Sequence, residues 1–586
     1  MRSLAAAPLL SLASAMTLSA GLSAAPARLI QDIQVGPGTS THLDQAIELG
    51  RRALFVADDQ VHGRELWVSD GSPEGTRLVR DVDPGPSGAF PAIEGLNLVA
   101  WRDRAYFTAT DGVHGLELWT TDGTEDGTRM VKDIRPGAAS SVGPLFAPLD
   151  SLLLFAADDG VHGLELWGSD GTPEGTRLVH DITPGPQGSP FVAPTRFDGF
   201  LFFASAPYSD GSDDVGLWRT DGTEEGTIRL ALLPGDFDSA VVYRGALWLI
   251  TFLDGIEPCQ LWRSDGTPVG TSRVADLPVF LTGSPKVAGD TLFFLGFDVS
   301  LGLPPPIDPT GFELWASDGT GAGTHLVKDI WPGPLSSSAG SLTAVGDTLF
   351  LTARDPVHGI ELWKSDGSEA GTVVVKDIVP GIGQGAFGGF GGMRNVEDIL
   401  LFSAFDGVSD VGLWRSDGTE EGTYLVQAFA PNLSASSGPR AFLTFGRRVA
   451  FTALEPATGR EPWAGRAAIL TRQPARALED LASDVRALGL LPGIEESLAA
   501  KLTAAHTALR GRGGARVALR LLDAFEREVD AHTPVPITSE DAADLLEFAE
   551  EIEGLLVVED GGAPVLARPP AFAGRDPSAR LALYTK

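Results

Sequence analysis

Short stretches of strand length, separated by turns, follow one another along residues 28–465. Within one stretch, apolar residues either alternate with polar ones or form a brief continuous run, as strands covered on one or both faces do. Two-residue turns such as Gly346-Asp347 join neighbouring antiparallel strands, because glycine supplies the positive φ that the turn needs. The clearest example has four such stretches, at residues 342–345, 348–355, 359–365 and 371–378. The pattern predicts four antiparallel strands per repeat.

A tryptophan marks each repeat, usually in the sequence Glu-Leu-Trp. Successive copies are 44 to 53 residues apart, which fits four short strands with their turns and is the length of a β-propeller blade. Alternation along the strand places the tryptophan and the preceding glutamate on one face, so the tryptophans are expected to pack between blades. Nine copies are present, at Trp67, Trp119, Trp167, Trp218, Trp262, Trp315, Trp363, Trp414 and Trp463.

The two ends of the repeat region complement each other. The copy around Trp463 lacks its outer strand, whereas residues 28–33 form an isolated strand of the outer type. Joining them would complete a ninth blade and remove the exposed strand edges of an open array. We therefore predict an all-β propeller of about nine four-stranded blades over residues 28–465, closed by its N-terminal strand. Eight blades with an irregular appendage are the alternative.

The pattern changes to a helical period after a linker at residues 466–473. Apolar residues recur every three or four positions in four segments between residues 474 and 557, which predicts a small four-helix bundle. Residues 558–586 are rich in proline and glycine towards their start and are predicted to be extended or disordered.

Composition and charge limit the partners and the cellular location that can be expected for this protein. The net charge is −34, and residues 1–465 carry most of it, with 59 acidic against 30 basic residues. The negative electrostatic field of so many carboxylates repels nucleic acid and anionic lipid, so we expect no nucleic-acid partner. Residues 1–27 resemble a signal peptide with cleavage near Ala27, and no later apolar run could span a bilayer. We expect a secreted, periplasmic or cell-surface protein.

Two segments resemble known families. Residues 313–320, Glu-Leu-Trp-Ala-Ser-Asp-Gly-Thr, and residues 323–330 resemble the ELWxxDGT repeat proteins of secreted bacterial origin, over about residues 28–465. Residues 498–525 resemble the FIMAH domain, a helical module at the C-terminus of many secreted bacterial proteins. These resemblances imply export and a propeller-like repeat. They supply no catalytic residues.

A second repeated element is the turn Ser-Asp-Gly-Thr-x-x-Gly-Thr, for example at residues 169–176, which resembles the Asp-box turn of sialidase-type propellers. Aspartate and hydroxyl side chains can bond the local backbone while glycine adopts a special φ, so the turn is expected to fix a hairpin. Cation binding, with Ca²⁺ as the ion, is the alternative. No cofactor is firmly indicated.

Candidate ligand-binding residues lie in loops between the second and third strands, which project opposite the Asp-box turns. An Asp, a His and a Glu at this spacing could collect a divalent ion or a polar ligand, or they could simply shape the loop. Four near-identical sets favour the second interpretation, because an active site needs one asymmetric constellation. The sets are Asp59, His62, Glu65; Asp111, His114, Glu117; Asp159, His162, Glu165; and Asp355, His358, Glu361.

The sequence contains no zinc-binding spacing, no phosphate-binding loop and no serine-hydrolase elbow. We therefore predict a secreted noncatalytic propeller that binds or scaffolds extracellular glycan or protein, with no catalytic residue assigned. A secreted polysaccharide hydrolase or lyase is one alternative, and a surface protein stabilised by divalent ions is another. Fold analogy alone supports the enzymatic alternative.

Overall fold

The chain forms two compact units, one of residues Ala27–Thr471 and a second that holds the described residues from Arg472 to Glu559. In this computed structural model the described residues are 26–33, 41–90, 97–189, 191–205, 214–252, 259–277, 279–298, 311–382, 385, 392–407, 410–431, 438–455, 459–510, 514–533 and 537–559.

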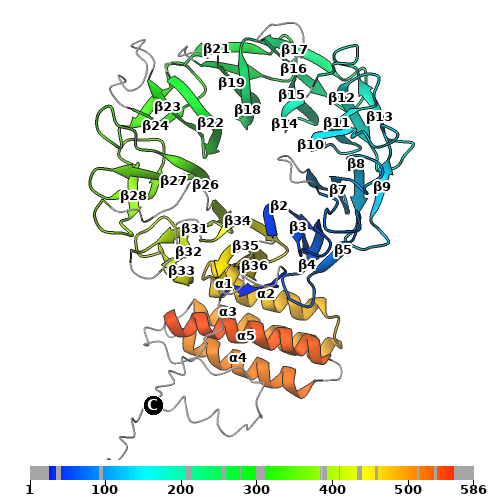
Figure 1. Cartoon of the computed structure of the whole chain (residues 1–586). Helices are drawn as coiled ribbons and strands as arrows, with labels where there is room; N and C mark the ends of the chain where they lie inside the picture. The colour runs from blue at the N-terminus through cyan, green and yellow to red at the C-terminus, as the bar shows by residue number, and fades with distance from the viewer. Residues whose placement is uncertain are drawn as a thin grey trace, which may run out of the picture. The chain divides into compact units, whose positions relative to one another are not determined.

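The first unit is a ring of nine four-stranded antiparallel sheets (Figure 1). In each of the first eight blades, the strands pair in chain order. Blades 1 to 4 are β2 (Thr41–Leu49), β3 (Arg52–Asp58), β4 (Arg64–Ser69), β5 (Arg77–Arg80); β6 (Leu98–Trp101), β7 (Arg104–Ala109), β8 (Glu117–Thr121), β9 (Arg129–Lys132); β10 (Val142–Pro148), β11 (Leu153–Asp158), β12 (Leu164–Ser169), β13 (Arg177–His180); and β14 (Phe191–Phe197), β15 (Phe200–Ser205), β16 (Val215–Thr220), β17 (Ile228–Leu233).

Blades 5 to 8 repeat this arrangement. They are β18 (Asp236–Tyr243), β19 (Ala246–Phe252), β20 (Gln260–Ser264), β21 (Ser272–Asp276); β22 (Val279–Ala288), β23 (Thr291–Asp298), β24 (Glu313–Ser317), β25 (His325–Lys328); β26 (Gly340–Val345), β27 (Thr348–Asp355), β28 (Gly359–Ser365), β29 (Val373–Lys376); and β30 (Met393–Val396), β31 (Ile399–Phe405), β32 (Asp410–Ser416), β33 (Tyr424–Pro431). The nine-bladed prediction is confirmed, and the eight-bladed alternative is wrong.

The ninth blade contains both ends of the ring. Its strands are β34 (Arg440–Phe445), β35 (Arg448–Glu455), β36 (Gly459–Arg466) and β1 (Arg28–Leu29), in the order β1-β36-β35-β34. We call residues 27–33, which include β1, the strap.

Six hydrogen bonds and register pairs hold the strap in place. The Ala27 N–H donates to Gln427 Oε1 at 2.8 Å, and Gln427 Nε2 donates back to the Ala27 carbonyl at 3.1 Å. Arg28 and Leu29 pair with Ala464 and Trp463, the Ile30 N–H donates to Pro462 O at 2.8 Å, and the Ile33 N–H donates to Glu461 Oε2 at 3.2 Å. Ala27, Ile30 and Ile33 are buried. The strap therefore supplies the missing outer strand, as predicted.

Each blade is sandwiched between two others, which explains its sequence. The second strands are buried almost throughout, as in β11 (LLFAAD), because both of their faces are covered. The repeated tryptophans pack against the preceding blade: Trp119 of blade 2 joins Leu54 and Val68 of blade 1, and Trp363 of blade 7 joins Leu314 of blade 6. The predicted inter-blade role of the tryptophans is confirmed.

The Asp-box turns fix the hairpins between the third and fourth strands. In blade 3, Asp170 Oδ1 accepts hydrogen bonds from the backbone N–H and the hydroxyl of Thr172, at 2.9 and 2.7 Å. Ser169 Oγ and Thr176 Oγ1 lie 2.7 Å apart inside the turn. A Cβ at Gly175 would lie only 2.1 Å from Asp170 Oδ1, so the glycine is required by a close approach. The turn carries out the structural role predicted for it.

The predicted linker at residues 466–473 is largely structured. It contains the last residue of β36 and a short helix, α1 (Ala467–Leu470). A helix of four residues is too short to be predicted from the spacing of its apolar residues. Ala467 and Leu470 belong to the apolar cluster of blades 8 and 9, so α1 is part of the first unit.

The described part of the second unit contains four helices, as predicted. They are α2 (Pro474–Ala487), α3 (Pro492–Leu509), α4 (Gly514–Ala531) and α5 (Ser539–Glu559). The helices α2 and α3, α3 and α4, α4 and α5, and α2 and α5 pack together around buried apolar residues that include Leu481, Leu502, Phe525 and Ile552. Residues 1–25 and 560–586, where the signal peptide and most of the tail were predicted, lie outside the described residues.

Candidate functional site

Each candidate loop between the second and third strands is organised by its aspartate. Asp59 Oδ1 accepts hydrogen bonds from the backbone N–H groups of Val61 and His62, at 2.9 and 2.8 Å. Asp59 Oδ2 lies 2.7 Å from His62 Nδ1. The aspartate therefore closes the loop and orients the imidazole, so that Nε2 is the ring nitrogen left for other contacts.

The same arrangement recurs in blades 2, 3 and 7. Nδ1 of the histidine lies 2.8 Å from the aspartate carboxylate in each, and the four histidine side chains are between 33 % and 38 % exposed. The hydrogen bond from the aspartate raises the pKa of His62, His114 and His162. The residue before each histidine is a strongly exposed valine: Val61, Val113 and Val161 at 66 % and Val357 at 63 %.

The glutamates of the four sets point the other way, into the protein. Glu65 is fully buried, and its Oε1 accepts hydrogen bonds from the backbone N–H groups of Val82, Asp83 and Ala89, at 3.0 to 3.2 Å. These residues lie in the connection from blade 1 to blade 2. Glu65 thus holds that connection against its own blade.

Other blades use the same device. Glu117, Glu165, Glu313 and Glu361 are also fully buried and accept backbone N–H groups from the connection that follows their blade. Burial raises the pKa of Glu65, Glu165, Glu313 and Glu361 to about 7, although the hydrogen bonds they accept act in the opposite direction. Burial likewise raises the pKa of Glu117.

The structure therefore divides each predicted set. Asp59 and His62, and their counterparts in blades 2, 3 and 7, lie together at the surface, whereas the glutamates are inside and unavailable to a ligand in solvent. The candidate set of ligand-binding residues needs correction at the glutamates, because the glutamate side chain is committed to the backbone of the next connection. The interpretation in which Asp, His and Glu collect one ligand was the less favoured of the two. The glutamate's partner lies 17 to 24 residues further along the chain, which loop spacing does not indicate.

Within the described residues, no group of three or more His, Cys, Asp or Glu side chains is placed to hold a metal ion. Among the same residues, no helix is both long enough and apolar enough to cross a membrane.

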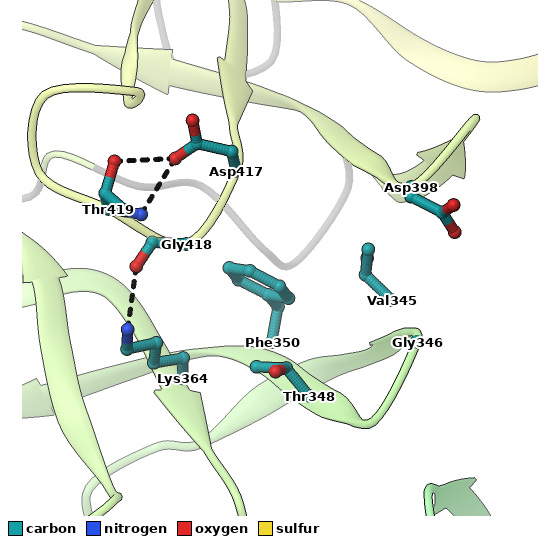
Figure 2. Close-up of a pocket in the computed structure, with 9 residues that line it drawn as sticks. All are labelled: Val345, Gly346, Thr348, Phe350, Lys364, Asp398, Asp417, Gly418 and Thr419. Carbon is teal, nitrogen blue, oxygen red and sulfur yellow. Dashed lines mark hydrogen bonds between the residues drawn. The ribbon is translucent and has the colours of Figure 1, made fainter.

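A pocket of about 260 Å³ lies between blades 7 and 8, on the face of the ring opposite the Asp/His loops (Figure 2). Blade 7 contributes Phe350 and Lys364, and blade 8 contributes Asp398 and Asp417. The Asp417 carboxylate is paired with Arg415, whose Nη2 lies 3.4 Å from Asp417 Oδ2. Lys364 Nζ donates to the carbonyl of Gly418 at 2.8 Å. We call this the blade 7–8 pocket; its lining is completed by Val345, Gly346, Thr348, Gly418 and Thr419.

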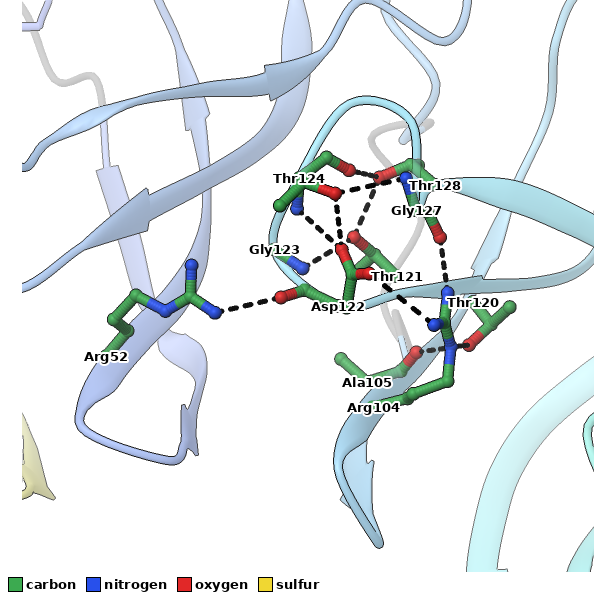
Figure 3. Close-up of polar contacts among 10 residues, drawn as sticks. All are labelled: Arg52, Arg104, Ala105, Thr120, Thr121, Asp122, Gly123, Thr124, Gly127 and Thr128. Atoms are coloured by element: carbon green, nitrogen blue, oxygen red, sulfur yellow. Dashed lines mark hydrogen bonds and ion pairs between the residues drawn. The ribbon is translucent and has the colours of Figure 1, made fainter.

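Sequence analysis missed this pocket, because its residues come from two repeats that meet only in the folded ring. Thr348 begins the second strand of blade 7, as Thr291 does in blade 6, whereas Arg52 begins that of blade 1. Arg52 Nη2 reaches across to blade 2 and donates to the carbonyl of Asp122 at 2.9 Å (Figure 3). Threonine is too short to span that space.

No family model and no curated protein matches the chain. Similar solved structures include a prolyl endopeptidase (13% identity, TM-score 0.35, covering 58% of this chain and 50% of that one) and a puromycin hydrolase (13%, 0.30, 65% and 60%). A third is the dipeptidyl peptidase 4 of Porphyromonas gingivalis (10%, 0.42, 72% and 65%). The chain spans between half and just under two thirds of the length of these peptidases.

These comparisons correct the functional prediction made from the sequence. That prediction was a noncatalytic ring acting on extracellular glycan or protein, with a polysaccharide-cleaving enzyme and an ion-stabilised surface protein as alternatives. The solved structures named above are peptidases, the likeness to them is one of fold, and the earlier prediction is not proposed again.

Proposed function

We propose that this chain is a peptidase-associated propeller, a ring that docks against a peptidase body carried by another chain. The observation that supports the proposal most directly is the uneven distribution of exposed aliphatic side chains between the two faces of the ring. The likeness to propeller-containing peptidases is one of fold.

One face of the ring carries the loops between second and third strands and the connections between blades, and we call it the connection face. Its exposed aliphatic side chains are Val61, Val113, Val161, Val357, Leu335 at 54 % and Ile382 at 82 % exposure. On the opposite face, the exposed aliphatic side chain in the described turns is Val269, in the Asp-box turn of blade 5. Clusters of exposed apolar side chains in a polar surround are typical of protein–protein contact sites.

Blades 1, 2 and 3 give this face a continuous section. Each presents the same tip, an exposed valine beside an imidazole that is held by an aspartate. Neighbouring blades repeat the tip at a regular interval, so a partner can contact several valines at once. The aspartates around the tips favour a partner surface in which apolar residues are flanked by basic ones.

We expect the triple variant Val61→Asp, Val113→Asp, Val161→Asp to lose its peptidase partner, because three carboxylates would enter an apolar contact. The immobilised full chain would be exposed to an extract of its own source cells, and the peptide-cleaving activity that it retains would be measured. The wild type should retain activity, and the triple variant at least about tenfold less, a difference of about 1.4 kcal/mol in binding.

The matched control is Val269→Asp, which places the same charge on the opposite face and should retain activity like the wild type. Equal retention by the triple variant, or no peptide-cleaving activity on the wild-type chain, would refute the proposal. Melting curves of all variants would establish that each ring is folded.

We also propose that the ring acts outside the cytoplasm and belongs with the ELWxxDGT repeat proteins, with a FIMAH-like C-terminal module. Support comes from the signal-like residues 1–27 and from the repeated motif. The N-terminal sequence of the protein purified from its source should begin near Ala27. An intact N-terminus on protein found in the cytoplasmic fraction would contradict export.

A further inference from the structure

We propose that blade 7 provides a second contact for the peptidase body. This contact binds a carboxylate set among apolar side chains, and it fixes the orientation of that body on the ring. The inference rests on the proposed function and adds the chemistry of one contact to it. The contact lies on the connection face and consists of five residues that are exposed or half-buried. We call them the blade 7 patch: Trp331, Leu335, Arg354, Val357 and Ile382.

Blade 7 differs from blade 3 at the surface, although the two blades have the same fold. Equivalent residues are 196 positions apart, as Trp167 and Trp363 are. The second and third strands pair in the same register in both blades, and each blade has a histidine Nδ1 2.8 Å from an aspartate. Four residues of blade 3 and its connections are replaced by apolar or cationic ones in the patch: Arg135 by Trp331, Ala139 by Leu335, Asp158 by Arg354 and Pro186 by Ile382. Because blade 3 forms the same sheet without them, the fold does not require these four residues.

The changes at Trp331 and Arg354 leave a cation without a counterion. In blade 3, Arg135 Nη1 lies 2.5 Å from Asp158 Oδ2, so the two charges neutralise each other. In blade 7, the Arg354 guanidinium lies over the Trp331 ring, with Cζ 4.7 Å from the ring centroid. Within the described part of the ring, no carboxylate forms an ion pair with Arg354.

The two acidic residues of these loops are engaged in other contacts. Asp355 is buried, and its carboxylate accepts the backbone N–H of His358 at 2.6 Å and lies 2.8 Å from His358 Nδ1. Asp329 Oδ2 accepts a backbone N–H at 3.1 Å. Arg354 is held in place, because its Nε donates to the Ser336 carbonyl at 3.1 Å. Its remaining guanidinium N–H groups can therefore donate to a carboxylate of a partner.

Three strongly exposed aliphatic side chains lie in the loops around this cation. Leu335, at 54 % exposure, is in the connection that enters blade 7, Val357, at 63 %, is in the loop beside Arg354, and Ile382, at 82 %, is in the connection that leaves the blade. Exposed aliphatic side chains next to tryptophan and arginine have the composition of strong protein–protein contacts. The partner that we assign is therefore a peptidase body with a surface segment of apolar side chains around one carboxylate.

The patch distinguishes one orientation of the partner from the others. The valine tips of blades 1–3 are alike, so a body rotated by one blade would still meet two of them. Blade 7 lies across the ring from blade 2, with blades 8, 9 and 1 between them on one side and blades 3 to 6 on the other (Figure 1). A body that contacts both regions has one position, because any rotation moves its carboxylate away from Arg354.

The test is a variant that gives blade 7 the surface charges of blade 3. The double variant Trp331→Arg, Arg354→Asp copies the ion pair of Arg135 and Asp158, so the sheet should fold as it does in blade 3. The immobilised full chain would be exposed to an extract of its source cells. The retained peptide-cleaving activity would be measured, and the retained protein identified by mass spectrometry. The double variant should retain at least about tenfold less activity than the wild type.

Single variants test the contact with a carboxylate. Arg354→Gln should also retain at least about tenfold less activity, whereas Arg354→Lys should retain more than Arg354→Gln, because it keeps the positive charge. Arg177→Gln is the matched control, since Arg177 is an exposed arginine of the outer strand β13, and it should behave like the wild type. Arg354 is only half-buried, so its single variants remain informative if melting curves show that the double variant does not fold.

Wild-type activity on a folded double variant would overturn the patch. Wild-type activity on Arg354→Gln, or an equal loss in Arg354→Gln and Arg354→Lys, would overturn the carboxylate contact. The two proposals fail separately. If the triple valine variant loses activity and the patch variants do not, only the patch is refuted. If the patch variants lose activity and the triple valine variant does not, only the docking at the valine tips is refuted. A wild-type chain that retains no activity refutes both.

Discussion

Lowering the pH from 8 to 5.5 will raise the melting temperature of the propeller. Glu65, Glu165, Glu313 and Glu361 have a pKa of about 7 in the folded chain, against 4.5 as the ordinary value. For a raised pKa, the folded state binds the proton more tightly than the unfolded state. The contribution to stability is therefore complete below pH 4.5 and is lost as the pH rises through 7.

The expected size is about 1–2 kcal/mol for each glutamate over this interval, as an upper value. His62, His114 and His162 act in the same direction, because their pKa is also raised and their stabilising contribution is lost at higher pH. Asp59, Asp111 and Asp159 have a lowered pKa and act only in stronger acid, where their stabilising contribution is lost as the pH falls through the folded value. Stability should therefore be greatest near pH 5.

Calorimetric melts at several pH values would measure this. The variant with Gln at all four glutamate positions cannot titrate there and should show a much flatter dependence on pH. Asp103→Gln, at an exposed hairpin position, is the control and should leave the dependence unchanged. A melting temperature that rises from pH 5.5 to 8 would contradict the prediction.

Trp119→Ala will destabilise the ring by about 3–5 kcal/mol, the cost of removing a large buried aromatic side chain. Trp119 is 6 % exposed, packs among the apolar residues of blade 1 and lies 6.5 Å from the Phe107 ring, centroid to centroid. The truncation leaves a cavity between two blades, and neither sheet can move in to fill it without disturbing its other neighbour.

Chemical denaturation would report the loss, with Trp119→Phe as the comparison that keeps most of the packing. That variant should cost far less, because it keeps an aromatic ring in the contact. A loss below about 1 kcal/mol for Trp119→Ala would mean that the tryptophan is not an inter-blade anchor.

The sequence predicted the architecture well because the repeat expresses it locally. A tryptophan every 44 to 53 residues, with hairpin glycines between, specifies a blade wherever it occurs, and the unmatched strand at residues 28–33 shows how the ring closes. The candidate site was predicted only in part. The link between Asp59 and His62 is local, three residues apart, whereas the position of Glu65 depends on how the next connection folds over it.

The blade 7–8 pocket could not be predicted from one repeat. It needs residues of two blades, Phe350 and Lys364 from blade 7 and Asp398 and Asp417 from blade 8, and these meet only in the folded ring.

The strap also determines the order in which the ring can form during synthesis. Each of the first eight blades consists of consecutive strands, so it can fold once its own residues have left the ribosome or the export channel. The ninth cannot, because Ile30 must wait for Pro462, and Ile33 for Glu461, 428 residues later. Contacts so distant in sequence form slowly. The first segment of the ring to be made is thus the last to be fixed, and the ring closes only when the propeller is complete.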